Sequence, residues 1–177
     1  DALPICTMGE RHTNPQKWNL RLENRDTGAK IDPRLSVFDQ REDVTVVKLP
    51  YFGDEEHEGV IERAIPTITV QTVDGPVKVT TVYDLILANY GIDRGIGGEV
   101  ATSYTDDTPY TPTWQEKITG VKADIAIATA REFADNAEKT KGRSMIIMGG
   151  GINHWYHADI IYRTILNLIM FCGTDGV

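Results

Sequence analysis

Short runs of β-branched and alternating residues dominate the first half of the chain. Each run is bounded by residues that favour turns, such as those at positions 26–28 and 74–76. The segment Asp74-Gly75-Pro76 lies between two of the runs and is a typical hairpin signal. We therefore predict four strands, at residues 18–22, 44–49, 65–73 and 77–82. The acidic stretch over residues 54–63 predicts a surface loop.

The pattern changes to a helical period after residue 81. Thr81 and Asp84 precede an apolar stretch that ends near Gly91, so we predict a short helix there. Residues 91–113 are rich in Gly, Thr, Asp and Pro and predict a long loop that is functional or wraps another part of the protein. Further helices are predicted at residues 113–118, 122–136 and 155–171. The inward face predicted for the second of these consists of Ile125, Ile127, Ala128, Ala130, Phe133 and Ala134.

An apolar run at residues 144–148 leads directly into Gly149, Gly150 and Gly151. A nearly continuous apolar run suits a strand that is buried on both faces, as in a mainly parallel sheet. The last third of the chain thus predicts helix–strand–turn–helix, half of an α/β nucleotide-binding layer. We predict an α/β fold, with an irregular β-rich part containing one helix at residues 1–110 and an α/β layer at residues 111–177.

Composition narrows the class of protein. The chain has 177 residues, of which 41% are hydrophobic, and a net charge of −8, which disfavours nucleic acid as a partner. Cys6 and Cys172 are the two cysteines and form no C-x-x-C pair, so neither a zinc ribbon nor an iron–sulfur cluster is predicted within this sequence. The chain starts at Asp1 and stops in a glycine-rich stretch after an apolar helix, from which we expect an internal piece of a longer protein.

The candidate chemistry centres on the three glycines and the histidines that follow them. Glycines between a strand and a helix let a ligand approach the backbone, and a helix start attracts anions. The dinucleotide fingerprint G-x-G-x-x-G is incomplete, because position 154 is histidine. His154 and His157 are three apart, and three roles stay open for them: metal ligation, structural packing, or an active-site neighbour for an anionic substrate. Arg163 interrupts the last apolar helix and would need an anionic partner if it were buried.

Several segments resemble the molybdopterin oxidoreductase family. Residues 110–121 contain a tryptophan followed by Thr-Gly-Val, and residues 130–134 read Ala-Arg-Glu-Phe-Ala, as in formate dehydrogenases, nitrate reductases and sulfoxide reductases. Residues 142–157, with the sequence Asn-His-Trp-Tyr-His at 153–157, are similar to the catalytic alpha subunits of membrane-bound respiratory nitrate reductases. Segments at residues 31–36, 46–50, 82–85 and 88–91 agree with this resemblance, which covers most of the chain.

The resemblance implies an enzyme that reduces nitrate to nitrite by two-electron oxygen-atom transfer. The parent protein would carry molybdenum held by two molybdopterin guanine dinucleotides and a [4Fe-4S] cluster, whose ligands lie outside this chain. Its partners would be an iron–sulfur beta subunit and a quinol-oxidising membrane gamma subunit, which would hold it at the membrane, on the cytoplasmic face in bacteria. The fragment alone is expected to be inactive. Within it, His154 is the candidate active-site neighbour. The candidate cofactor-binding residues are Gly149, Gly150, Gly151, Asn153, Gly173 and Gly176; no metal ligand is predicted.

Two alternatives remain open. The chain could belong to another molybdopterin oxidoreductase, such as a chlorate- or selenate-reducing relative. It could also be a non-catalytic binding domain of Rossmann type. The upstream sequence would discriminate them, because it carries the molybdenum and cluster ligands.

Overall fold

The computed structural model describes residues 22–23, 26–31, 35–51 and 59–174. The chain divides into two compact units, one formed by residues 34–128 and the other by residues 1–33 together with 129–177. Among the described residues, no helix is both long enough and apolar enough to cross a membrane.

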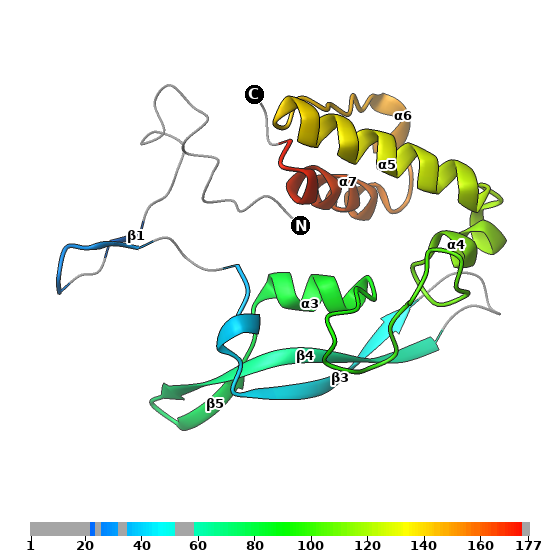
Figure 1. The fold of residues 1–177 in the computed structure, drawn as a ribbon. Helices are drawn as coiled ribbons and strands as arrows, with labels where there is room; N and C mark the ends of the chain where they lie inside the picture. The colour runs from blue at the N-terminus through cyan, green and yellow to red at the C-terminus, as the bar shows by residue number, and fades with distance from the viewer. Residues whose placement is uncertain (1–21, 24–25, 32–34, 52–58, 175–177) are drawn as a thin grey trace. The chain divides into compact units, whose positions relative to one another are not determined.

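The first unit is built on a three-stranded antiparallel sheet of order β3-β4-β5 (Figure 1). Its strands are β3 (Asp43–Tyr51), β4 (Gly59–Thr72) and β5 (Gly75–Val79). Three predicted strands and the hairpin at Gly75 are confirmed, and Gly75 has the positive φ of 113° that such a turn favours. The loop predicted at residues 54–63 is wrong for residues 59–63, which belong to β4; residues 54–58 lie outside the described part.

The middle of β4 forms the core of this unit. Ile61 and Ile65 lie on one face of the strand and Ala64 lies on the other, and all three are less than 9% exposed. Helix α3 (Val82–Asn89) packs on β4 and begins at Thr81, whose hydroxyl accepts a hydrogen bond from the Asp84 amide at 3.1 Å. The predicted helix start at Thr81 is therefore confirmed.

Residues 91–111 form the predicted long loop, and part of it covers an edge of β4. Gly98 pairs with Arg63 in an antiparallel bridge. The Glu99 amide donates to the Glu62 carbonyl at 2.8 Å, and the Glu62 amide donates to Glu99 Oε1 at 3.1 Å. The loop thus satisfies backbone groups that β3, on the opposite edge, cannot reach.

Helix α4 (Pro112–Thr119) follows the loop. The Thr111 hydroxyl accepts from the Trp114 amide at 3.2 Å, and Gly120, with φ of 75°, ends the helix close to the predicted end at residue 118. The Trp114 ring packs at an angle to Tyr110, with ring centres 5.3 Å apart, and edge-on to Tyr51 at 6.4 Å.

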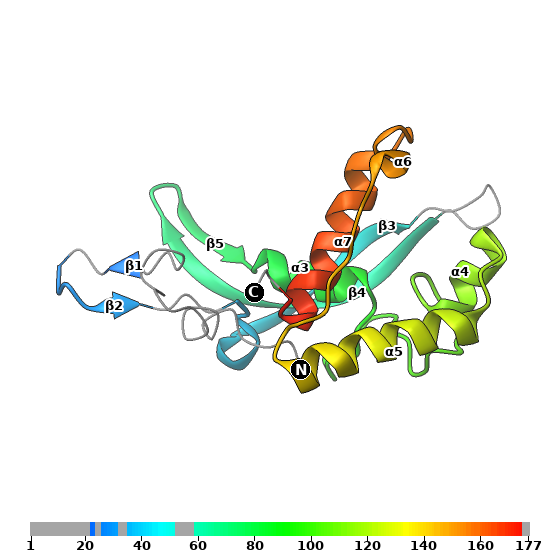
Figure 2. The same cartoon turned by 90° about the horizontal axis from the view of Figure 1, so that it is seen from above.

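The second unit contains a short hairpin and helical segments. Strands β1 (Leu22–Glu23) and β2 (Lys30–Ile31) pair around the predicted turn at residues 26–28, while residues 18–21 of the predicted first strand lie outside the described part. The helices are α5 (Ala123–Thr140), whose first turns belong to the other unit, α6 (Gly150–Asn153) and α7 (Ala158–Cys172) (Figure 2). Every strand pair among the described residues is antiparallel, so the predicted parallel pairing is not found there.

The inward face predicted for α5 is wrong. Ile125 is 58% exposed, and the alanines at positions 128, 130 and 134 are exposed as well, whereas Ile127 and Phe133 are half-buried. Ala137 is the buried residue of this helix. The apolar periodicity correctly predicted a helix, but the described residues do not cover the face that the periodicity marks.

Candidate functional site

The candidate segment starts where α5 ends, and that end is fixed by a specific backbone motif. The Gly142 amide donates to the Ala137 carbonyl at 2.6 Å, and the Lys141 amide donates to the Glu138 carbonyl at 3.3 Å. Lys141 has a φ of 58°, so the paired bonds and the left-handed residue form a Schellman ending. The chain therefore leaves α5 in a defined direction.

A buried serine ties the next residues to the same helix. The Ser144 hydroxyl donates to the Phe133 carbonyl at 3.1 Å and accepts from Asn136 Nδ2 at 2.8 Å. Ser144 is 9% exposed. These bonds hold the start of the apolar run against α5.

The strand predicted at residues 144–148 is wrong, because these residues form no strand pairing and no regular element. Burial nevertheless alternates along the run. Met145 and Ile147 are 78% and 84% exposed, whereas Ile146 and Met148 are half-buried. Alternation is typical of extended backbone, but a strand also needs a neighbouring strand, and the described residues supply none here.

The three glycines begin the one-turn helix α6. Gly149 precedes it with an extended backbone, and Gly150 and Gly151 are within it. A Cβ atom built at any of the three would meet no atom within 4 Å. Neither crowding nor a positive φ therefore requires glycine here, and the backbone is open on its outer side.

The polar residues after the glycines lie on an exposed connection, not at the start of a long helix. His154 ends α6 and His157 precedes α7 without capping it through its side chain. The two histidines therefore do not share one face of a helix. Asn153 accepts a hydrogen bond from the Tyr162 hydroxyl of α7, and Tyr156 packs edge-on to His157 with ring centres 4.6 Å apart.

The remaining candidates lie at the end of α7 or away from the glycines. Gly173 has a φ of 61° and ends α7, and Thr174 donates from its amide to the Ile169 carbonyl at 3.0 Å. Gly176 lies outside the described residues. Arg163 is exposed, so its predicted need for a buried anionic partner does not arise. Within the described part of the chain, no three His, Cys, Asp or Glu residues are placed to hold a metal ion.

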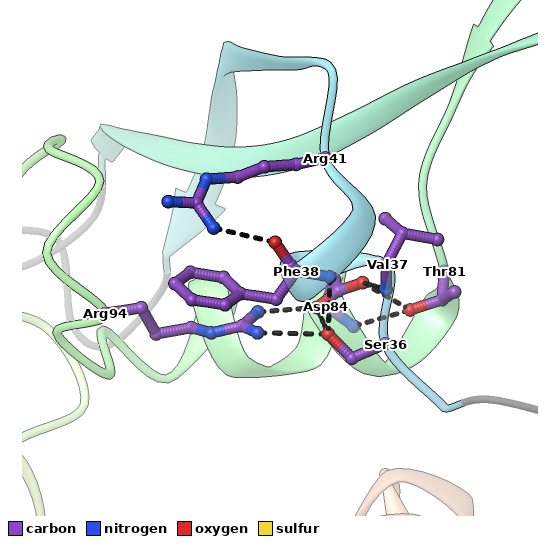
Figure 3. Close-up of polar contacts among 7 residues, drawn as sticks. All are labelled: Ser36, Val37, Phe38, Arg41, Thr81, Asp84 and Arg94. Carbon is purple, nitrogen blue, oxygen red and sulfur yellow. Dashed lines mark hydrogen bonds and ion pairs between the residues drawn. The ribbon is translucent and has the colours of Figure 1, made fainter.

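A buried polar cluster in the first unit was missed from the sequence. Asp84 is 1% exposed and accepts hydrogen bonds from Ser36 Oγ at 2.6 Å and Thr81 Oγ1 at 2.7 Å (Figure 3). The Val37 amide donates to the same carboxylate at 2.9 Å, and Arg94 forms an ion pair with it. Burial alone would raise the pKa of Asp84, but these hydrogen bonds outweigh burial and lower the pKa. The pattern Thr81-x-x-Asp84 indicated a helix cap and gave no sign of the long-range partners.

An aromatic ring extends this cluster. Phe38 lies between two guanidinium groups, with Arg41 4.3 Å and Arg94 4.1 Å from its ring centre (Figure 3). The polar groups of the Asp84 cluster are well satisfied, so its chemistry is that of a structural clasp between residues 36–41, α3 and Arg94.

Comparisons with known proteins identify the chain. It is 48% identical to the nitrate reductase alpha chain of Bacillus subtilis (strain 168) over 176 residues, which are 99% of this chain and 14% of that one. It is 46% identical to the respiratory nitrate reductase 1 alpha chain of Escherichia coli (strain K12), over 98% of this chain and 15% of that one. A shorter match, 42% over 66 residues or 37% of this chain, is to the perchlorate reductase subunit alpha of Dechloromonas aromatica (strain RCB). No family model matches.

Each of these relatives is the alpha chain of a reductase. The nearly complete coverage at 46–48% identity shows that the chain belongs with the respiratory nitrate reductase alpha chains. It spans about a seventh of the length of those relatives and corresponds to one section of them. The resemblance derived from the sequence is thereby confirmed.

Proposed function

We propose that this chain forms one section of the catalytic alpha subunit of a respiratory nitrate reductase. The observation that carries the proposal is the match of 98–99% of the chain to nitrate reductase alpha chains. The whole subunit would reduce nitrate to nitrite, a reaction that consumes two electrons and two protons. Its electrons would come through an iron–sulfur beta subunit from a quinol-oxidising membrane subunit, and the assembly would lie at the cytoplasmic face of the membrane.

Within this section, residues 111–177 would contribute to the layer that binds molybdopterin guanine dinucleotide. The open outer side of Gly149–Gly151 supports the idea, since a bulky ligand can lie directly over that backbone. Asn153, Gly173 and Gly176 are the further candidates for contact with the cofactor. The molybdenum ligand and the cluster ligands would come from other parts of the subunit, as the resemblance to the molybdopterin oxidoreductases implies.

The bound molybdenum centre would supply the oxygen-atom transfer itself. The contribution of this section would be to bind and orient the anion. His154 lies exposed on the connection between α6 and α7, so its imidazole is accessible to a ligand. A ring N–H of His154 would donate a hydrogen bond to an oxygen of nitrate, and we propose this residue as a neighbour of the reacting anion.

Replacing His154 tests this assignment. We expect His154→Ala in the intact enzyme to lower kcat and kcat/KM together by roughly 10- to 1000-fold, the range seen when one stabilising donor is lost. His157→Ala is the matched control, because this histidine precedes α7 and packs against Tyr156. Steady-state kinetics must be combined with molybdenum and guanine-nucleotide contents of the same samples. Normal turnover of His154→Ala at full cofactor content would contradict the assignment, and loss of cofactor with unchanged activity per molybdenum would make His154 structural.

A second candidate is a reductase for a chlorine oxyanion, which the partial match to a perchlorate reductase favours. That match covers 37% of this chain, much less than the nitrate reductase matches. The ratio of kcat/KM for nitrate to that for chlorate and perchlorate discriminates the two proposals. A ratio below one would favour the second.

A further inference from the structure

Arg63, in the middle of β4, is buried and has no hydrogen-bond partner in the described part of the chain. The residue is 1% exposed, and Nε, Nη1 and Nη2 are all buried with no acceptor among the described residues. A guanidinium carries five N–H donors and keeps its charge in proteins. Burying such a group without a counter-charge or acceptors is strongly unfavourable, so an acceptor must complete this site in the folded protein.

Two glycines lie against Arg63, one beside its guanidinium and one beside its backbone. Gly91, with φ of 72°, ends α3, and a Cβ atom at this position would lie 2.8 Å from Arg63 Nη2. Gly98, with φ of 86°, pairs with the Arg63 backbone, and a Cβ atom there would lie 2.6 Å from the Ala64 amide nitrogen. Backbone therefore approaches the arginine where any larger residue would collide with it.

The nearby polar side chains do not neutralise Arg63 through a hydrogen bond. Glu99 attracts it electrostatically, but Oε1 of Glu99 accepts from the Glu62 amide. Tyr110 donates its hydroxyl to the Pro50 carbonyl at 3.4 Å. Burial raises the pKa of the Tyr110 phenol, so this group stays neutral, and burial lowers the pKa of Arg63 against the attraction of Glu99 and Tyr110.

The contrast with Asp84 in the same unit is informative. There the buried charge is met by an ion pair with Arg94 and by hydrogen bonds from Ser36, Val37 and Thr81. The described residues thus compensate the buried charge of Asp84, whereas the buried charge of Arg63 has no direct partner among them. The backbone of Tyr110, beside Arg63, has a φ of 75°, which is uncommon for a residue with a side chain and is typical of sites held in a fixed shape.

We infer that Arg63 is the binding group of an internal site for a small monovalent anion, of the size and charge of a halide. Water alone would satisfy the donors but would leave the charge without a direct counter-ion. A single small anion supplies both the acceptor and the counter-charge, and a compact ion suits a guanidinium that the backbone of Gly91 approaches closely. This site is independent of the proposed reaction, since it lies in the unit that does not contain His154.

Bromide is a suitable probe because its anomalous scattering identifies it directly. Crystals of the intact alpha subunit, soaked in sodium bromide and measured at the bromine absorption edge, should show an anomalous peak in contact with the Arg63 nitrogens. The peak should be lost in Arg63→Met and retained in Arg143→Met, which removes an exposed arginine.

The inference would be overturned by bromide peaks restricted to surface arginines, by water alone beside Arg63, or by a carboxylate from elsewhere in the subunit bonded to it. A peak that persists in Arg63→Met would also overturn it. If Arg63→Met does not fold, the soak of the unmodified subunit together with Arg143→Met decides the question.

Discussion

Asp84→Asn should loosen the clasp at the start of α3. The amide keeps the shape of the carboxylate but loses its charge and turns an NH₂ group toward partners that are donors. Removing one member of a buried ion pair typically costs about 3–5 kcal/mol. The Arg94 side chain is 16% exposed and so can be partly hydrated, which lowers our expectation to about 2–4 kcal/mol.

Amide hydrogen exchange is the direct assay, because the Val37 amide donates to Asp84 at 2.9 Å. A local loss of 2–4 kcal/mol corresponds to exchange that is roughly 30- to 900-fold faster. Mass spectrometry of peptides that cover residues 35–42 would measure it. The control is Asp107→Asn, which breaks an ion pair with Lys117 whose side chains are about half exposed and should cost less than about 1 kcal/mol. Equal protection of residues 35–42 in both variants would refute the reasoning.

Three further outcomes are expected. The pKa of Asp84 is lowered in the folded state, so the stability that this carboxylate contributes is present above its unfolded pKa and is lost as pH falls through its folded pKa. Amide exchange at Val37, corrected for its intrinsic pH dependence, should therefore become faster in acid. The Asp84→Asn variant should not show this pH dependence. Thr111→Ala should cost about 1 kcal/mol of stability in urea unfolding, whereas Thr111→Ser should keep the cap of α4. The isolated chain should bind a hydrophobic dye such as ANS, since Leu166 and Met170 of α7 are 52% and 51% exposed. Circular dichroism must show helical signal in the same sample, because dye binding by an unfolded chain would not test the exposed face of α7.

Local signals in the sequence predicted the ends of elements well. Thr81 caps a helix because its hydroxyl satisfies a free amide at the first turn, and Gly120 ends one because it adopts a left-handed backbone without a steric penalty. The turn at Gly75 follows from the same backbone freedom. Each of these features depends on a few neighbouring residues, which the sequence contains in full.

Features that depend on distant partners were not predictable in the same way. The run at residues 144–148 has the composition of a strand, but pairing requires a second strand, which no local pattern reveals. Arginine interrupts two apolar stretches, at positions 63 and 163, and the apolar helical pattern around Arg163 raised the question of a buried guanidinium there. The structure buries Arg63 instead, because Gly91, 28 residues further along the chain, leaves room for its guanidinium.

The loop at residues 91–111 determines how far the sheet can grow. Because Gly98 and Glu99 occupy the edge of β4 near Arg63, and β5 occupies the same edge from Ile68 onward, another strand could join the sheet only outside β3 or β5. A deletion within this loop would uncover amide and carbonyl groups in the middle of the sheet, where a second chain could add to them. The loop is long and irregular, the usual marks of a segment that tolerates shortening, yet it protects the sheet against edge-to-edge association.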